Sequence, residues 1–360
     1  MKMTLRAFSL IMMTAMSVVQ ADAAQEIKAK PDKVWLHKGS GFAFPATSGA
    51  FVRRDMTDIS DGKQIDISAT YDDPSSGSVA TLYLYRPAMP DPALWFDVSN
   101  WFLQRSSRFG QVKPAGGPTA FRIAESHGSA ALRQSHSITE IGRSSGVAII
   151  PLGPWLMKLR LTSRAFEPGA LDQAMRDFLV SLPWPTKMPA ANDTVPITSC
   201  SAPLDAAPAT EIKQENAVIL LGAIMASKTK EPAEPSATEL PVRLCRDDSL
   251  SDSAYPLYQL DEGRTGYVLA LGDNGTLLSV RDDRTSASVA SELAGNGTEN
   301  AAPFYRVTIM TPERWEQYPA FAQLPSPSQA MDITRQRRPL SVTSILGKGS
   351  KIELDSESFK

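Results

Sequence analysis

The sequence predicts an α+β protein, with an antiparallel sheet and packed helices in a sandwich-like first domain and a second, β-rich α+β domain after it. Two observations predict the class: segments with two-residue apolar alternation, clearest at residues 65–71, and an order of strands, helix, strands, helix. The length of 360 residues exceeds the usual size of one core, which predicts two domains.

Residues 1–24 are predicted to be a secretory signal peptide. Lys2 and Arg6 give a basic start, residues 7–19 are apolar, and Ala21-Asp22-Ala23 has the small-x-small form of a cleavage site. An uncleaved anchor is the alternative, but the apolar stretch is short for a membrane span. No cysteine lies at the junction, so a lipid anchor is not expected. The mature protein is therefore expected to be periplasmic or secreted.

The first domain is placed at residues 25–186. Residues 51–59 and 65–71 are expected strands, followed by the nearly unbroken apolar and aromatic run 79–85. Such a run between turn residues is typical of a strand covered on both faces, so we expect it in the centre of the sheet.

A first helix is predicted to begin at Asp91-Pro92, because Asp is a good N-cap and Pro suits the first turn. Gly110 is placed to close its last turn. A stripe of mainly apolar residues and one arginine follows at the spacing of an amphipathic helix, and it comprises Leu94, Val98, Trp101, Phe102, Arg105 and Phe109.

Three further strands are expected at residues 119–125, at residues 130–141, and at residues 147–162 with a break at 151–154. In the last of these, alternation directs Lys158 and Arg160 outward. A second helix is predicted from Pro168 until Pro183-Trp184-Pro185 ends it.

The opening Gly41-Phe42-x-Phe44-Pro45, the element order and the closing helix resemble the PsbP/Mog1-like group of α/β/α sandwich domains. The resemblance covers about residues 34–186. It implies a non-enzymatic accessory or binding module, and it carries no functional residue over to this chain.

Residues 187–210 shift to Ala, Pro, Ser, Thr and Asp, which predicts an interdomain linker. The second domain is placed at residues 211–347 and a flexible tail at 348–360. It is expected to contain a buried apolar helix at 217–226 and a short helix at 288–293. Asp273-Asn274-Gly275 is a strong hairpin signal. Further strands are expected at 242–245, 255–260, 266–271, 276–280 and 304–310, and a capped helix start at 311–315.

Cys200 and Cys245 are the two cysteines of a chain expected in an oxidising compartment, so a disulfide between them is predicted. It would close a loop of about 45 residues, worth roughly 4 kcal/mol. Neither belongs to a Cys-x-x-Cys pair, which gives no support to thiol-disulfide catalysis.

Two segments match the sequence patterns of catalytic motifs but lack the secondary structure that these motifs require. Gly142-Arg143-Ser144-Ser145-Gly146 has the G-x-S-x-G pattern, yet a strand follows it where a nucleophile elbow needs a helix, so we expect a hairpin turn. Ser227-Lys228-Thr229-Lys230 has the S-x-x-K pattern at a helix end, without its companion motifs.

Histidines are few, and His136 and His127 are the candidate binding residues. Sharing a metal would require them to face each other across a turn at Ala131-Leu132, which neither residue favours. His136 shares parity with Leu132 and Ile138, so a buried, hydrogen-bonded core histidine is the simpler interpretation. No metal and no cofactor is expected.

The charge balance gives no support to nucleic-acid binding. Without residues 1–24 the chain has 35 basic and 38 acidic residues, and binding nucleic acid would need a concentrated basic face. The basic cluster Arg335, Arg337 and Arg338 fits a solvated loop. No transmembrane segment is expected in the mature chain.

These observations predict an exported, non-catalytic accessory protein that engages an envelope protein or a polysaccharide. The alternative is an envelope hydrolase for sugar or peptide that uses paired acids of the second domain: Asp247-Asp248, Asp261-Glu262 and Asp282-Asp283. An assembly factor for envelope proteins is a third possibility, which an exposed apolar groove would indicate.

Overall fold

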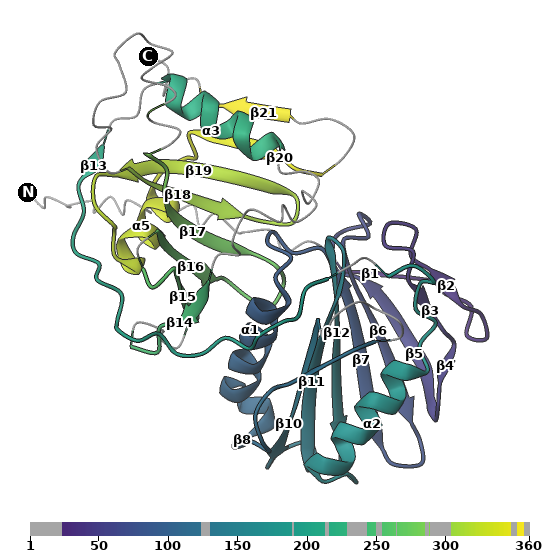
Figure 1. The fold of residues 1–360 in the computed structure, drawn as a ribbon. Coiled ribbons are helices and arrows are strands. Elements are labelled where there is room, and N and C mark those ends of the chain that lie inside the picture. The colour runs from purple at the N-terminus through teal and green to yellow at the C-terminus, as the bar shows by residue number, and fades with distance from the viewer. Residues whose placement is uncertain are drawn as a thin grey trace, which may run out of the picture.

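The computed structural model describes residues 24–123, 130–188, 191–212, 216–228, 243–249, 254–263, 265–284, 288, 304–346 and 351–355. These residues form two large antiparallel sheets with helices packed on them (Figure 1). The fold is therefore α+β with two β-rich domains, as predicted.

The first sheet has ten strands, and β7 lies between β6 and β12. The central position predicted for residues 79–85 is thus confirmed, but the expected cover on both faces is not, because Val79 is exposed and Thr81 and Tyr83 on the same face are only partly buried. The sheet order is β1 (Gln25–Glu26), β5 (Phe51–Asp58), β6 (Asp66–Asp73), β7 (Ser78–Tyr85), β12 (Trp155–Ser163), β11 (Ser144–Leu152), β10 (Ala131–Ile138) and β8 (Val112–Pro114), with β4 (Thr47–Ser48) on β5 and β9 (Thr119–Phe121) on β10. A separate pair joins β2 (Trp35–Leu36) to β3 (Ala43–Phe44).

Helix α2 (Pro168–Val180) covers one face of this sheet and α1 (Pro92–Arg105) packs on the other (Figure 1). The Asp91 side chain caps α1, because its Oδ1 accepts hydrogen bonds from the amides of Ala93 and Leu94 at 2.8 and 3.1 Å. The helix ends at Arg105, earlier than expected, and a 3₁₀ turn (Ser107–Phe109) precedes Gly110.

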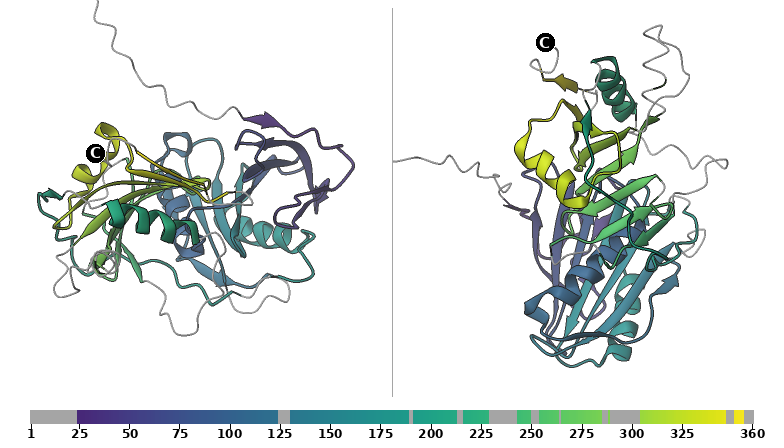
Figure 2. Two further views of the ribbon diagram at one scale, coloured as in Figure 1. Left: turned by 90° about the horizontal axis from the view of Figure 1, so that it is seen from above. Right: turned by 90° about the vertical axis from the view of Figure 1, so that its left-hand side faces the viewer.

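Helix α1 is buried on more sides than the predicted single stripe, because it lies between the two sheets (Figures 1 and 2). Trp95, Phe96 and Ser99 are buried in addition to the stripe. One apolar core joins α1 and the first sheet to side chains of the second sheet, which are Tyr258, Leu260, Val268, Ala270, Leu277 and Met310.

The second sheet has nine strands and carries helices α3 (Asn216–Lys228) and α5 (Pro327–Gln336). The apolar helix and the strands predicted for this domain are present, but the helix is not fully buried as expected, because Leu220 and Ile224 are exposed. The order is β14 (Leu244–Arg246), β15 (Leu257–Leu260), β16 (Gly266–Ala270), β17 (Leu277–Asp282), β18 (Tyr305–Met310), β19 (Arg314–Phe321), β20 (Ser341–Ser344) and β21 (Lys351–Leu354), with β13 (Glu211–Ile212) on β19.

The structure differs from the predictions at three places in this domain. The expected helix start at 311–315 is a turn that leads into strand β19, where the Thr311 hydroxyl accepts a hydrogen bond from the Arg314 amide at 3.0 Å. Helix α5, capped by Ser326, contains Arg335 of the expected loop. Residues 351–354 of the expected flexible tail pair with β20. The short helix expected at 288–293 lies almost wholly outside the described residues.

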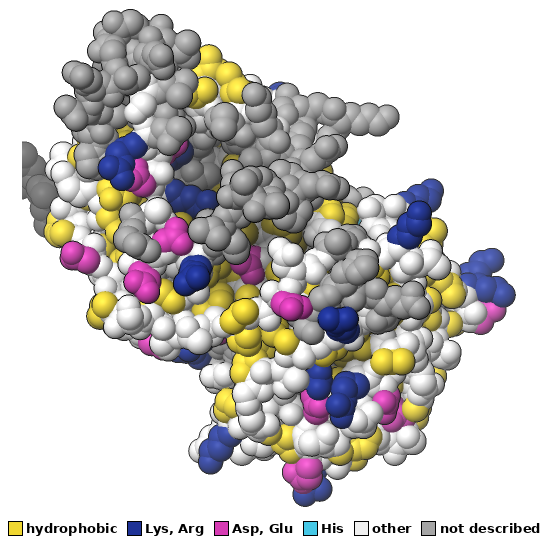
Figure 3. All heavy atoms as spheres, in the orientation of Figure 1, with side chains coloured by type: hydrophobic (Ala, Val, Ile, Leu, Met, Phe, Trp, Pro, Cys, Tyr) yellow, Lys and Arg dark blue, Asp and Glu magenta, His cyan; other side chains and the backbone are white. Residues whose placement is uncertain are grey.

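No helix in the described ranges is long and apolar enough to cross a membrane. Acidic and basic side chains are scattered among hydrophobic and uncharged ones over the face drawn in Figure 3.

Candidate functional site

A cavity of about 270 Å³ lies where the β16–β17 turn of the second domain meets the first sheet. We call it the Lys158 cavity. Seven of its lining residues are polar or aromatic residues that can bind a ligand: Asp66, Tyr83, Tyr85, Lys158, Arg160, Asp273 and Asn274. They come from β6, β7, β12 and the turn, so neither domain forms the cavity alone.

The turn is fixed against the first domain through Gly275 and Asp273. Gly275 has φ +87°, and a Cβ there would lie 2.8 Å from Pro87 Cα, so both the turn and the close approach favour glycine. The Ala88 amide donates to the Gly275 carbonyl at 3.0 Å. Asp273 Oδ1 accepts a hydrogen bond from Ser99 Oγ of α1 at 2.7 Å.

Lys158 is the buried cation of this cavity, with 4% of its surface exposed. Its Nζ lies 2.8 Å from Asp273 Oδ2 and 4.7 Å from the centre of the Tyr83 ring. Burial lowers the pKa of Lys158, while Asp273 acts in the opposite direction. The expectation that Lys158 faces solvent is wrong, because the turn of the second domain covers the outward side of β12.

Asp66 supplies a carboxyl group that no described residue engages in an ion pair or side-chain hydrogen bond. Burial raises the pKa of Asp66 from 3.8 to about 6, and Lys158 opposes this shift. The Tyr85 hydroxyl is also buried, with no hydrogen-bond partner in the described part of the chain. Buried polar groups of this kind are normally satisfied by protein, water or ligand, so the cavity is suited to a polar occupant.

A polar surface extends from the cavity across the half of the first sheet that α1 leaves open, since α1 packs on β10 and β11. We call it the polar sheet face. Its cross-strand neighbours form two rows, Thr57–Ser68–Tyr83–Lys158 and Asp55–Thr70–Thr81–Arg160. All are partly exposed or exposed except Lys158. Hydroxyl groups therefore dominate the centre of this surface.

Of the two predicted histidine candidates, the structure describes His136, whereas His127 lies outside the described residues. His136 is fully buried on the face of β10 that also carries Leu132 and Ile138, and burial lowers its pKa to about 4. His136 is therefore neutral at physiological pH. The described residues contain no group of three or more His, Cys, Asp or Glu side chains placed to hold a metal ion.

The two motif serines lie where the sequence placed them. Residues 142–146 form the turn and the first residues of β11, and the hydroxyl of the motif serine Ser144 donates to the Phe166 carbonyl at 2.7 Å. Ser227 is near the end of α3, and its hydroxyl donates to the Ile224 carbonyl at 2.6 Å.

The paired acids of the second domain act mainly in ion pairs and turns. Asp283 lies 2.5 Å from Arg306 Nε, and Asp282 pairs with Arg284. Asp247 is buried, which alone would raise its pKa, but the hydrogen bonds to its carboxylate lower the pKa below the usual value. Two acids of this domain line a cavity that holds a second carboxyl: Asp248, next to Asp97, and Asp273, in the same cavity as Asp66. The sequence identified Asp248 as one of the paired acids, but Asp273 only as part of a turn.

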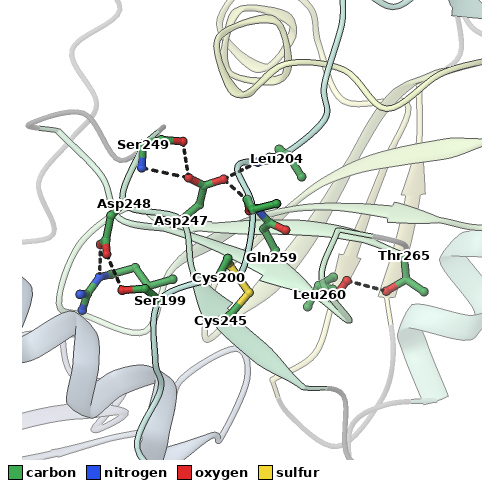
Figure 4. Close-up of a disulfide and its surroundings, with 12 residues drawn as sticks. Ser199, Cys200, Leu204, Cys245, Asp247, Asp248, Ser249, Gln259, Leu260 and Thr265 are labelled. Carbon is green, nitrogen blue, oxygen red and sulfur yellow. Dashed lines mark hydrogen bonds and ion pairs between the residues drawn. A yellow bond between two sulfur atoms is a disulfide. The ribbon is translucent and has the colours of Figure 1, made fainter.

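Cys200 and Cys245 form the predicted disulfide (Figure 4). It fixes the linker beside β14, where Ser199 forms a parallel bridge with Arg246 and the Cys200 amide donates to the Arg246 carbonyl at 2.9 Å. The Asp247 carboxylate close to it accepts hydrogen bonds from the Leu204 amide and Gln259 Nε2 at 2.6 and 2.7 Å. The disulfide therefore holds one wall of the junction between the domains.

Comparison of the chain with protein-family models, with curated proteins and with solved structures finds no match.

Proposed function

We propose that this is an exported, non-catalytic binding protein of a bacterial envelope, periplasmic or secreted, whose polar sheet face engages an envelope protein or a polysaccharide. The observation that carries the proposal is that α2 covers one side of the first sheet whereas α1 covers only half of the other. The open half presents hydroxyl groups with a cavity at its edge. The resemblance to PsbP/Mog1-like domains supports the same role.

The chemistry of this surface suits reversible recognition. Hydroxyl groups both donate and accept hydrogen bonds, and short side chains on a sheet make a flat surface on which a partner can lie. Arg54 borders it and is paired with Asp72 at 3.0 Å. Because the charges at this border are paired, hydrogen bonding rather than net charge would determine the choice of partner.

Substitution at the centre of the face tests the proposal. Thr70 and Thr81 are cross-strand neighbours there, so Thr70→Arg and Thr81→Arg would place a bulky cation in any interface. The matched control is Val180→Arg at the end of α2, where the side chain is 78% exposed on the opposite side of the sheet.

The wild type and each variant, at native abundance, would serve as bait to recover binding partners from periplasmic extract. Each would also be tested for co-sedimentation with isolated envelope polysaccharide. We expect wild type and Val180→Arg to retain a partner that both threonine variants lose. Recovery of nothing above background by the wild type, or equal recovery by all variants, would contradict the proposal.

One observation favours a second candidate, an envelope hydrolase for sugar or peptide. Asp66, with its raised pKa, and Asp273, which is held beside Lys158, line the same cavity. A pair of carboxyl groups, one of which has a raised pKa, is the pattern used in general acid catalysis. If the protein is such an enzyme, wild type will release soluble fragments from envelope polysaccharide or peptide and Asp66→Asn will not.

A further inference from the structure

A second cavity, of about 290 Å³, lies on the other side of the domain junction, between α1, the linker and β14. We call it the linker pocket. Helix α1 contributes Asn100, Trp101 and Arg105, β10 contributes Gln134, the linker contributes Ile197 and β14 contributes Arg246. Its volume is at the lower end of the range for ligand pockets, about 300–1,000 Å³, so it suits a single small molecule.

One wall of this pocket is formed by one arginine that is paired with two aspartates, so its formal net charge is −1. Arg246 lies 2.7 Å from Asp97 and 2.6 Å from Asp248. The Tyr258 hydroxyl donates to Asp97 Oδ2 at 2.9 Å, and Ser199 Oγ donates to Asp248 Oδ2 at 2.6 Å. The two acids and the arginine hydrogen-bond within this wall, and Arg105 at the rim balances the remaining negative charge of the residues that line the pocket.

The floor of the pocket carries a free acceptor and a free donor. Asn100 donates its Nδ2 to the Phe96 carbonyl at 3.0 Å, which leaves its Oδ1 as the acceptor. Asn100 Oδ1 and Trp101 Nε1 are both buried and have no hydrogen-bond partner among the residues that the structure describes. The residues are 6% and 3% exposed. Each such group costs about 1–3 kcal/mol if it stays unsatisfied, so an occupant that pairs with both is favoured.

The rim adds a positive charge. The Arg105 guanidinium lies 4.1 Å from the centre of the Trp101 ring, in a cation–π contact that holds it at the same residue as the free indole N–H. Within the described ranges Arg105 forms no ion pair. The pocket therefore offers two donors, Arg105 and Trp101 Nε1, and the acceptor Asn100 Oδ1 to an occupant.

We propose that the linker pocket binds a small hydroxycarboxylate, of which a single sugar acid is the form best suited to its size. The carboxylate would accept hydrogen bonds from Arg105 and Trp101 Nε1, and a hydroxyl of the ligand would donate to Asn100 Oδ1. Because the walls come from both domains and from the linker, the bound ligand would also strengthen their junction. This site lies apart from the polar sheet face, and its occupancy does not depend on the function proposed for that face.

Isothermal titration of the full-length mature protein tests the assignment with three probes: D-glucuronate, D-glucose and acetate. Glucose supplies the hydroxyls without the carboxylate, and acetate supplies the carboxylate without the hydroxyls. We expect glucuronate to bind at one site, at least about tenfold more tightly than either of the others, because each lacks one half of the pairing.

Two variants connect that binding to the pocket. Arg105→Gln removes the rim charge, and Trp101→Phe removes the indole N–H while keeping an aromatic ring. Each is expected to weaken glucuronate binding about tenfold, the effect of losing one hydrogen bond to a charged group. Arg108→Gln changes an exposed arginine that does not line the pocket and is expected to leave binding unchanged. Unfolding curves would confirm that each variant is folded.

Three results would overturn the proposal. The first is that the wild type does not bind glucuronate at about 10 mM ligand, which would show that water alone fills the pocket. The second is equal affinity for glucuronate and glucose, and the third is glucuronate binding that Arg105→Gln and Trp101→Phe leave unchanged. If Trp101→Phe does not fold, Arg105→Gln alone decides, since its side chain is exposed. None of these results would bear on partner recovery by the threonine variants, so this proposal and the proposed function can fail separately.

Discussion

At the scale of one residue, the contact between the two domains changes the pKa of the Asp66 carboxyl group. Asp66 alternates with buried Ile67 on β6 and would face water if the first domain stood alone. Burial at the junction raises its pKa to about 6, with Asp273 and Asp58 acting in the same direction and Lys158 opposing them. The folded protein therefore holds a proton on Asp66 more tightly than the unfolded chain does.

The stability of the wild type should consequently fall as pH rises from about 4 to about 6, because in this interval the folded state binds more protons at this site. The shift from 3.8 to about 6 corresponds to at most about 3 kcal/mol. We expect Asp66→Asn to be more stable than wild type above pH 6 and equal to it below pH 4.

Urea unfolding at a series of pH values measures this difference. Asp205→Asn, which changes an exposed carboxyl of the linker, is the control and should follow the wild-type profile. Parallel pH profiles for wild type and Asp66→Asn would show that the carboxyl is ordinarily solvated.

At the scale of elements, the linker is an ordered part of the structure where it passes β14. The backbone bonds between residues 198–200 and Arg246 and the disulfide hold it there. The same segment places Ile197 in the wall of the linker pocket. A covalent constraint between two distant segments restricts mainly the unfolded chain.

We expect Cys200→Ser with Cys245→Ser to lower the free energy of unfolding by roughly 4 kcal/mol, the loop-closure value for this separation. Urea unfolding with and without reductant measures the effect. Reductant should destabilise the wild type and leave the double variant unchanged. A reduced wild type that is as stable as the oxidised protein would show that the backbone bonds alone hold the linker.

At the scale of the whole molecule, the two domains share one apolar core around α1. Tyr258, Val268 and Leu277 of the second sheet pack in the same cluster as Leu94 and Trp95. Removal of the second domain would expose this side of α1 to water. Exposed apolar surface of this kind lowers stability and attracts hydrophobic dyes.

A fragment of residues 25–188 is therefore expected to bind a hydrophobic dye and to unfold at lower urea than the intact chain. The loss should be several kcal/mol, similar to truncating more than one buried side chain at about 2–5 kcal/mol each. Dye fluorescence and urea unfolding of the fragment and the intact protein make the comparison. A fragment with unchanged midpoint and no dye binding would show that the domains are energetically independent.

The sequence by itself determined most strands of the first sheet and β14 to β18 of the second, because local alternation reports which side chains share a face, but it missed β19, β20 and β21. It placed residues 79–85 in the centre of the first sheet, the hairpin at Asp273-Asn274-Gly275 and the helix start at Asp91. It also predicted the disulfide, since two cysteines in an oxidising compartment allow a single pairing. These features depend on neighbouring residues or on composition, which a sequence shows directly.

The tertiary structure alone decided which outward faces of the strands and of α1 are covered by the other domain. The two cavities form at this domain junction, so they too depend on the tertiary structure. Periodicity gave the correct side for Lys158 but not its burial, because Asp273, its partner, is 115 residues away in the sequence. Arg246 and Asp97 are 149 residues apart, and the burial of α1 on several sides depends on the second sheet. Contacts at such separations arise from the docking of two folded surfaces, and local patterns carry no information about that docking.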